Sequence, residues 1–323
     1  MAVKIRDLVS EDLPDLVILL NNAMREQHEF IPYTDATLQQ RIQEGKLTVW
    51  VAEERGELIG SAAFSSGHWG EEIRWLAVQQ RPDRKVVEND LVEEAEKQVK
   101  GQAISTSVDA GSEKINEWIE RGFEPDGGMY QMLAKPNMPL PITEVPENFI
   151  IRNLRPEEEK EFVKAVNAGF GFERLKQNEL QKWKADFPDF SEEWIFVAEF
   201  EKKIVSILVA KPDINYNRFF NAKRGYLGPA TTIPEFRSKG LASILCCHAM
   251  NFLLRKGLTP FVLYTAEQNI ASVTLLRKLG FNVFHHWKFM RKTLPEKTQI
   301  ENLETEFQHD SENITSDGKI LKR

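Results

Sequence analysis

The sequence predicts an α/β (α+β) protein built from two related domains, each a mixed central sheet flanked by helices. Three observations support this prediction. Helical and strand periods alternate along both halves, short motifs recur in the second half, and a proline-rich segment lies between the halves. The chain of 323 residues, 41% of them hydrophobic, can form two cores at about 100 to 200 residues per domain.

The internal repeat links the beginning of each half and also the end of each half. The matching segments are Lys4–Arg6 with Ile150–Arg152, Val51–Glu53 with Val197–Glu199, and Arg121–Phe123 with Leu279–Phe281. The first two pairs are offset by 146 (152 − 6 and 199 − 53), and the third is offset by 158 (281 − 123). The second copy has therefore gained residues in its middle.

The segment between the copies predicts the domain boundary. It contains four prolines, Pro136, Pro139, Pro141 and Pro146, which favour an extended connection. We expect a degenerate first domain over residues 1–135, a linker over 136–148 and a catalytic domain over 149–294. Residues 295–323 are polar, with Phe307 as their one aromatic residue, so a flexible or loosely docked tail is expected.

In the second half each expected element has a local reason. A helix begins at Pro156, because proline suits the first helical turn and the glutamates after it suit the positive dipole end. The polar turn at 201–203 joins two apolar strands as a hairpin. The expected strands cover 149–153, 194–200, 204–211, 224–233, 261–265 and 281–291, and the other helices cover 178–187, 240–256 and 270–278. The first half has the same order from Val3 to Lys135.

Composition excludes several classes of function and compartment. The net charge of −7 argues against nucleic-acid binding, which usually needs a basic surface. Cys246 and Cys247 are adjacent, which suits neither a disulfide nor a zinc site, and a cytoplasmic location is expected. No signal peptide or membrane span is expected, because the apolar run Leu241–Leu254 is shorter than about 20 residues. His285 and His286 would point to opposite faces of a strand, so no metal site is expected.

The stretch Arg237–Ala242 predicts a phosphate-binding loop. It lies between a strand and an apolar helix, where the first backbone N–H groups of the helix have no intrahelical partners and form an anion site. Gly240 allows close approach of a pyrophosphate, and Arg237 and Lys239 supply positive charge. The alternative for these six residues alone is a plain basic helix start.

Two linked motifs resemble the GNAT family of CoA-dependent N-acyltransferases. The segment Ile233–Ala242 reads as aliphatic-Pro-x-aromatic-Arg-x-x-Gly-x-Ala, and Asn269–Phe281 is similar to the second family segment at the required spacing. The resemblance implies that acetyl-CoA is the acyl donor and that the strand before the loop splays from its neighbour to bind the cofactor arm. The implied cofactor-binding residues are Thr231, Thr232, Ile233, Arg237, Ser238, Lys239, Gly240, Leu241, Ala242 and Asn269. Asn269 also fits a helix N-cap, and both roles are compatible.

The acid and base of the reaction are less clearly marked. Many members of the family place a tyrosine that protonates the leaving thiolate at the position of Leu276. Tyr264 and Tyr226 are candidate substitutes, with ordinary strand aromatics as the alternative. Glu267 is a candidate base, with an exposed loop carboxylate as the alternative.

In the first half, the segment Arg84–Asn89 matches the loop only in part. Aligning Arg84 with Arg237 places Val87 at the position of Gly240, where a stiff side chain should obstruct a pyrophosphate, and Glu88 adds repulsion. We therefore expect the cofactor site to be lost there, and the first half to have a structural or substrate-shaping role.

The sequence thus predicts an N-acetyltransferase that moves the acetyl group of acetyl-CoA to a primary amine of a small molecule or peptide. Two alternatives remain at this point, a non-catalytic CoA-sensing or interaction protein and an aminoacyl transferase on the same double fold. The acceptor and the oligomeric state do not follow from the sequence.

Overall fold

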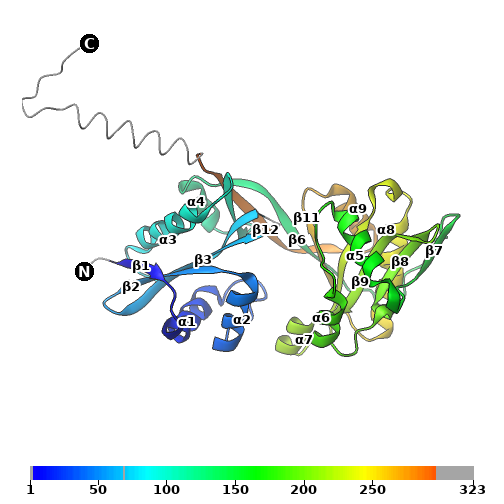
Figure 1. Ribbon diagram of the computed structural model, residues 1–323, viewed down its shortest axis with the longest axis horizontal. Helices are drawn as coiled ribbons and strands as arrows, with labels where there is room; N and C mark the ends of the chain where they lie inside the picture. The colour runs from blue at the N-terminus through cyan, green and yellow to red at the C-terminus, as the bar shows by residue number, and fades with distance from the viewer. Residues whose placement is uncertain (1–2, 68–69, 296–323) are drawn as a thin grey trace, which may run out of the picture. The chain divides into compact units, whose positions relative to one another are not determined.

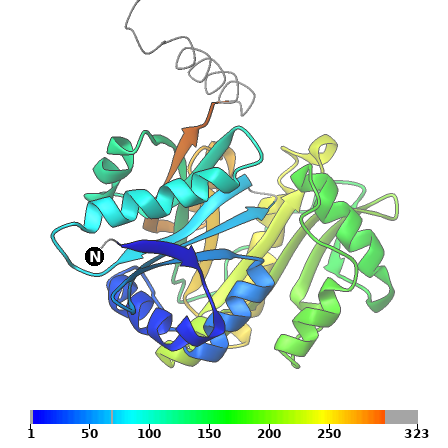
Figure 2. The same ribbon diagram turned by 60° about the vertical axis from the view of Figure 1, so that its left-hand side comes forward.

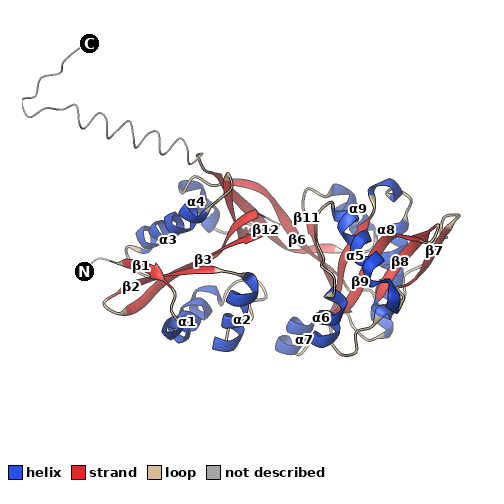
Figure 3. Cartoon of the chain, in the orientation of Figure 1, coloured by secondary structure: helices blue, strands red, loops and turns tan. Residues whose placement is uncertain are grey.

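The structure is a computed structural model that describes residues 3–67 and 70–295. Helices and strands alternate along the chain, which confirms the α/β fold class (Figure 3). The described residues form two compact units that do not follow chain order. Within the described ranges, the first unit draws on residues 3–26, 32–67, 70–126 and 289–295, and the second on Gln27–Ile31 and Gly127–Lys288. The tail expected at 295–323 lies, apart from Pro295, outside the described residues.

The second unit is a mixed sheet with the strand order β12-β6-β11-β10-β9-β8-β7 (Figure 1). Its strands are β6 (Glu124–Ala134), β7 (Phe149–Asn153), β8 (Ile195–Phe200), β9 (Lys203–Pro212), β10 (Gly225–Thr232), β11 (Phe261–Ala266) and β12 (Asn282–Thr293). Its helices are α5 (Glu159–Phe170), α6 (Glu179–Asp186), α7 (Ile214–Phe220), α8 (Leu241–Arg255) and α9 (Ile270–Lys278). The expected elements are present here, and α7 is the helix that the sequence did not predict.

The core of the second unit lies between its sheet and its helices. Helix α5 packs on β9 and β10, and α8 packs on β8, β9 and β10. Cys246 and Cys247 are buried on α8 as free thiols. None of the described helices is long and apolar enough to cross a bilayer.

The first unit repeats this plan with fewer elements. Its strands are β1 (Lys4–Asp7), β2 (Thr48–Glu54), β3 (Glu57–Gly67), β4 (Gly70–Val78) and β5 (Ala103–Asp109), and β12 follows β5 in the strand order. Its helices are α1 (Leu13–Met24), α2 (Asp35–Gly45), α3 (Arg84–Gln98) and α4 (Lys114–Glu120). Figure 2 shows α1 and α3 on opposite sides of these strands.

The repeated sequence motifs form the same ion-pair cluster in each unit. Arg6 bonds to Asp12 at 2.6 Å and to Glu53 at 2.7 Å. The equivalent cluster is centred on Arg152, which bonds to Glu158 at 2.7 Å and to Glu199 at 2.6 Å. The arginine and glutamate of the recurring motifs are thus partners, which is a physical reason for their recurrence at one offset.

Strand β6 crosses the boundary that the sequence suggested. It belongs to the first half of the chain, yet Met129–Ala134 pair antiparallel with β11, from Ala134↔Phe261 to Met129↔Ala266. The segment Gln27–Ile31, between α1 and α2, also belongs to the second unit. The linker at 136–148 therefore stays a prediction of where the second sequence copy begins. The compact units have a different boundary, because the second unit includes two segments from the first half of the chain.

Candidate cofactor and active site

Strand β10 separates from β11 soon after it begins. The two strands pair in parallel at Gly225↔Phe261 and Tyr226↔Val262. Strand β10 stays paired with β9 as far as Thr232, and the N–H of Ile233 still donates to the carbonyl of Val205 at 2.9 Å. Beyond Tyr226, no described strand is registered against the edge of β10 that faces away from β9. The splayed strand implied by the family resemblance is therefore present, with Thr231 and Thr232 half-buried along it.

The loop after β10 has the backbone geometry of an anion site. A short 3₁₀ turn, Pro234–Phe236, leads to Ser238 with φ of 63° and to Gly240 with φ of 79°, both left-handed. Gly240 is the N-cap of α8, and no described side chain caps that helix. A Cβ built on Gly240 would meet no described atom within 4 Å outside its chain neighbours. The free N–H groups and the open approach fit a pyrophosphate.

Arg237, which was expected to supply charge to this loop, donates to two backbone carbonyls. Its Nε donates to the carbonyl of Thr232 at 3.1 Å, and its Nη2 donates to the carbonyl of Gly169 at 2.9 Å. The guanidinium therefore ties the end of α5 to the splayed strand. Helix α5 comes so close because Gly169 lacks a side chain: a Cβ there would lie 2.2 Å from Oγ1 of Thr231.

The second family segment forms α9. The side chain of Asn269 accepts a hydrogen bond from the N–H of Ser272 at 3.1 Å, so the N-cap role is present. Leu276 is 4% exposed and lies in the core cluster of the second unit. It therefore occupies an apolar site and offers no polar group for proton transfer.

Both candidate tyrosines lie on one face of the sheet. Tyr226 is paired with Val262, and Tyr264 lies two residues further along β11, so their side chains share a face with ring centroids 6.1 Å apart. The hydroxyl of Tyr226 lies over the β10 bulge, since a Cβ on Gly228 would be 2.9 Å from it. Burial raises the pKa of both phenols, so each is a neutral proton donor at neutral pH.

Glu267 is held in an ion-pair cluster. Its carboxylate lies 2.5 Å from Nε2 of His286 and accepts from Nζ of Lys288 at 2.8 and 2.9 Å. Burial acts to raise the pKa of Glu267, but the bonds from Lys288 and His286 outweigh it and leave this pKa below its ordinary value. The side chain is 14% exposed, so the free loop carboxylate considered as an alternative is wrong. The same bonds weaken Glu267 as a base.

Lys211 is a residue of this face that the sequence analysis missed. It pairs with Tyr226 across β9 and β10, and its Nζ lies 5.1 Å from the ring centroid of Trp183 and 5.4 Å from that of Tyr226. Burial lowers the pKa of Lys211. The signal available in the sequence was a lysine that follows the apolar run Ile207–Ala210 within one strand.

The corresponding loop of the first unit is shorter. Five residues (79–83) separate β4 from α3, whereas eight (233–240) separate β10 from α8. Val87 is 1% exposed and packs in the core, so the expected obstruction by its side chain is wrong. The start of α3 also lacks a side-chain cap, but Arg84 in its first turn donates to Glu88 and Glu117, which places two carboxylates beside it.

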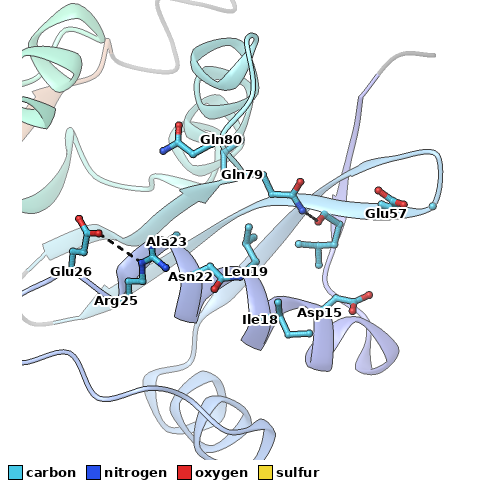
Figure 4. Close-up of a pocket in the computed structure, with 13 residues that line it drawn as sticks. Asp15, Ile18, Leu19, Asn22, Ala23, Arg25, Glu26, Glu57, Gln79 and Gln80 are labelled. Atoms are coloured by element: carbon cyan, nitrogen blue, oxygen red, sulfur yellow. Dashed lines mark hydrogen bonds and ion pairs between the residues drawn. The ribbon is translucent and has the colours of Figure 1, made fainter.

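A hollow of about 610 Å³ lies in the first unit between α1, the β2–β3 turn and the end of β4 (Figure 4). It is lined by Asp15, Ile18, Leu19, Asn22, Ala23, Arg25, Glu26, Gly56, Glu57, Leu58, Val78, Gln79 and Gln80. Three of these residues are acidic and one is basic. Such a lining disfavours a pyrophosphate.

The comparisons with known proteins agree with this geometry. Residues 154–281 match the model of the acetyltransferase (GNAT) family. A mycothiol acetyltransferase of Thermobispora bispora is 23% identical over 209 residues, 56% of this chain and 66% of that protein. The matches to two further mycothiol acetyltransferases span 48% and 43% of their lengths.

Two solved structures share the fold across both units. A GCN5-related N-acetyltransferase from Sphaerobacter thermophilus superposes with a TM-score of 0.66 at 18% identity, covering 90% of this chain and 95% of that one. A tandem GNAT protein from the clavulanic acid biosynthesis pathway gives a TM-score of 0.62 at 14% identity, covering 92% and 100%. Residues 154–281 therefore form a domain of the acetyltransferase (GNAT) family, and the solved structures show the same fold across both units.

Proposed function

We propose that this protein is an N-acetyltransferase that uses the second unit to transfer the acetyl group of acetyl-CoA to a primary amine. The observation that carries the proposal is the loop before α8, with left-handed Ser238 and Gly240 and an uncapped helix start beside the splayed end of β10. The N–H groups of Ser238–Ala242 would hold the pyrophosphate. Thr231, Thr232 and Ile233 would bind the pantetheine arm along the free edge of β10, with Asn269 nearby in the second motif.

The proposed chemistry is direct transfer. The amine nitrogen attacks the thioester carbonyl, a C–N bond forms, and the C–S bond breaks. The proton lost by the amine passes to water or to a base, for which Glu267 is the candidate, and the departing thiolate takes a proton from a tyrosine. Tyr264 is our first choice for that donor, because it lies beside the opening between β10 and β11 and is 42% exposed. Tyr226 is the second.

The acceptor is proposed only as a class, a small molecule or peptide with a primary amine. The matching relatives are named for acetylation of mycothiol, which supports a small-molecule acceptor. The buried Leu276 supports the competing function, a CoA-binding protein without turnover. A measurement of turnover distinguishes the acetyltransferase from the CoA-binding protein.

The test is thiol release from acetyl-CoA by the full chain against a panel of amines. We expect amine-dependent release, and we expect Tyr264→Phe to reduce kcat about 100-fold, the usual scale for loss of a general acid. Tyr226→Phe serves as the matched variant on the neighbouring strand and should reduce kcat less. Background release with every amine, combined with tight acetyl-CoA binding, would favour the sensor.

A further inference from the structure

Gln131 is a fully buried polar residue directly opposite Tyr264. The two are a register pair between β6 and β11, and Gln131 is 0% exposed. Its Nε2 lies 3.1 Å from the hydroxyl of Tyr264 and 2.9 Å from Oε2 of Glu29, and its Oε1 lies 2.7 Å from Nε2 of His28. Each polar atom of the amide therefore has a partner.

The chemistry of these partners determines the orientation of the amide. Glu29 receives two hydrogen bonds from Arg224, and although burial acts to raise the pKa of Glu29, the bonds from Arg224 and Gln131 leave it below its ordinary value. An ionised carboxylate only accepts, so the nitrogen side of Gln131 must face it. The oxygen side then accepts from the N–H of His28.

The hydroxyl of Tyr264 is oriented as a consequence. The second N–H of Gln131 donates to the phenol oxygen, so the phenol hydrogen is directed away from Gln131. Because Tyr264 is 42% exposed, its hydrogen is available to a group outside the core. The ring of His28 is fixed in turn by stacking on His285 at 3.9 Å and by an edge contact with Trp287 at 5.8 Å.

We propose that Gln131 is a positioning residue that presents the Tyr264 hydroxyl as the proton donor for acetyl transfer, with His28 fixing the Gln131 amide. This inference rests on the proposed function. Gln131 and His28 are both encoded in the first half of the chain and both belong to the second unit. The first half thus contributes to the active unit through these segments, although its own cofactor loop is short.

The charges around Tyr264 give the sign of the expected pH effect. Burial raises its pKa, the hydrogen bond from Gln131 lowers it, Glu29 and Asp213 raise it, and Arg224 lowers it. The rings of Tyr226 and Trp287 also lie near Tyr264, each with its centroid 6.1 Å from that of Tyr264. Loss of the Gln131 donor should therefore move the loss of activity at alkaline pH to higher pH.

The experiment compares Gln131→Leu with the full-length wild type and with the Tyr264→Phe background. We expect kcat for thiol release to fall about tenfold, the scale of one lost hydrogen bond to a developing charge. The alkaline limb of the kcat profile should shift upwards, and KM for acetyl-CoA should stay within about twofold. In the Tyr264→Phe background the same change should have no further effect. An equal fall in both backgrounds would overturn the inference.

His28 provides a second test that does not depend on a buried site. His28→Leu should lower kcat, as Gln131→Leu does. His28→Gln keeps an N–H donor and should recover most of the lost activity. If His28→Gln is as impaired as His28→Leu, the positioning role fails. Thermal unfolding of each variant separates lost positioning from lost folding. Impairment by Tyr264→Phe without an effect of Gln131→Leu would reject this inference alone, whereas absent turnover in the wild type would reject the proposed function.

Discussion

The two units share a fold and an ion-pair cluster but differ at the end of one strand. In the second unit, β10 leaves β11 and leads through eight residues to an uncapped helix start. In the first unit, five residues lead from β4 to α3, where Arg84 of the first turn is paired with the carboxylates of Glu88 and Glu117. The comparison teaches that the repeated fold tolerates loss of the loop, because the core and the ion pairs do not depend on it.

The equivalent helices differ in the same way. Helix α1 and helix α5 each have 12 residues and are offset by 146 (159 − 13), which aligns Ala23 with Gly169. Gly169 allows α5 to approach Thr231, while Ala23 lines the hollow of the first unit. The two aligned positions thus differ by one methyl group. Gly169 packs closely against the splayed strand, whereas Ala23 lines an open, acidic hollow.

The largest expected effect is on cofactor binding. Gly240→Val places a β-branched side chain at a positive φ and in the path of the pyrophosphate, so Kd for acetyl-CoA should rise on the order of 100-fold, ~2.7 kcal/mol. Calorimetry of the full chain should show one binding event in the wild type and none at the same concentrations in the variant.

Gly111→Val is the matched control in the first unit. Gly111 also has a positive φ, 87°, and a Cβ there would meet no described atom within 4 Å, so backbone strain is similar while the loop is intact. Its Kd for acetyl-CoA should equal that of the wild type. A second acetyl-CoA bound per chain, or an unchanged Kd in Gly240→Val, would contradict the contrast between the units.

The sequence was sufficient for the fold and for the loop, for identifiable reasons. The repeat was visible because its motifs contain the arginine and the glutamate of one ion pair in each unit, Arg6 with Glu53 and Arg152 with Glu199. The loop was visible because its residues are contiguous. Its geometry at Gly240 then followed from the need for a left-handed residue.

The polar network around Tyr264 could not be found in this way. His28, Gln131 and Tyr264 are separated by 103 and 133 residues along the chain, and their contacts arise only because β6 pairs with β11. Neither the residue types nor the local hydrophobic periodicity predicts that β6 pairs with β11. The prediction for Val87 was wrong for a related reason. The offset between the copies changes from 146 to 158 along the repeat, so aligning Arg84 with Arg237 alone could not establish which residue of α3 matches Gly240.

The next effect is on stability and compares the two ion-pair clusters. Arg152→Met leaves Glu158 and Glu199 without their arginine at 15% and 11% exposure, and should cost about 2 kcal/mol. Arg6→Met should cost less, about 1 kcal/mol, because Arg6 is 26% exposed and Glu53 is 30% exposed. Urea unfolding measures both, and hydrogen exchange should place the change at β7 and β1 respectively.

Acid provides the control for that pair of variants. Arg6 lowers the pKa of Asp12, and the bonds from Arg152 outweigh burial to lower the pKa of Glu158. Stability from a carboxyl with a lowered pKa is present above its unfolded value, about 4, and is lost as pH falls through the folded value. The difference between wild type and each variant should therefore shrink below about pH 4. A difference that is constant with pH would show that packing, rather than charge, is lost.

The smallest expected effect tests the methyl group that distinguishes α1 from α5. Gly169→Ala should force the end of α5 away from Thr231, because a Cβ would lie 2.2 Å from Oγ1 and 2.8 Å from Cγ2 of that residue. Overpacking of this kind should cost about 1 kcal/mol of stability, and the displaced strand should raise Kd for acetyl-CoA about threefold. Gly171→Ala, at a positive φ of 80° with no described atom within 4 Å of its Cβ, controls for strain at the same helix end. If Gly169→Ala binds acetyl-CoA as the wild type does, the close approach of α5 is a packing feature alone, and the loop before α8 accounts for the whole difference between the units.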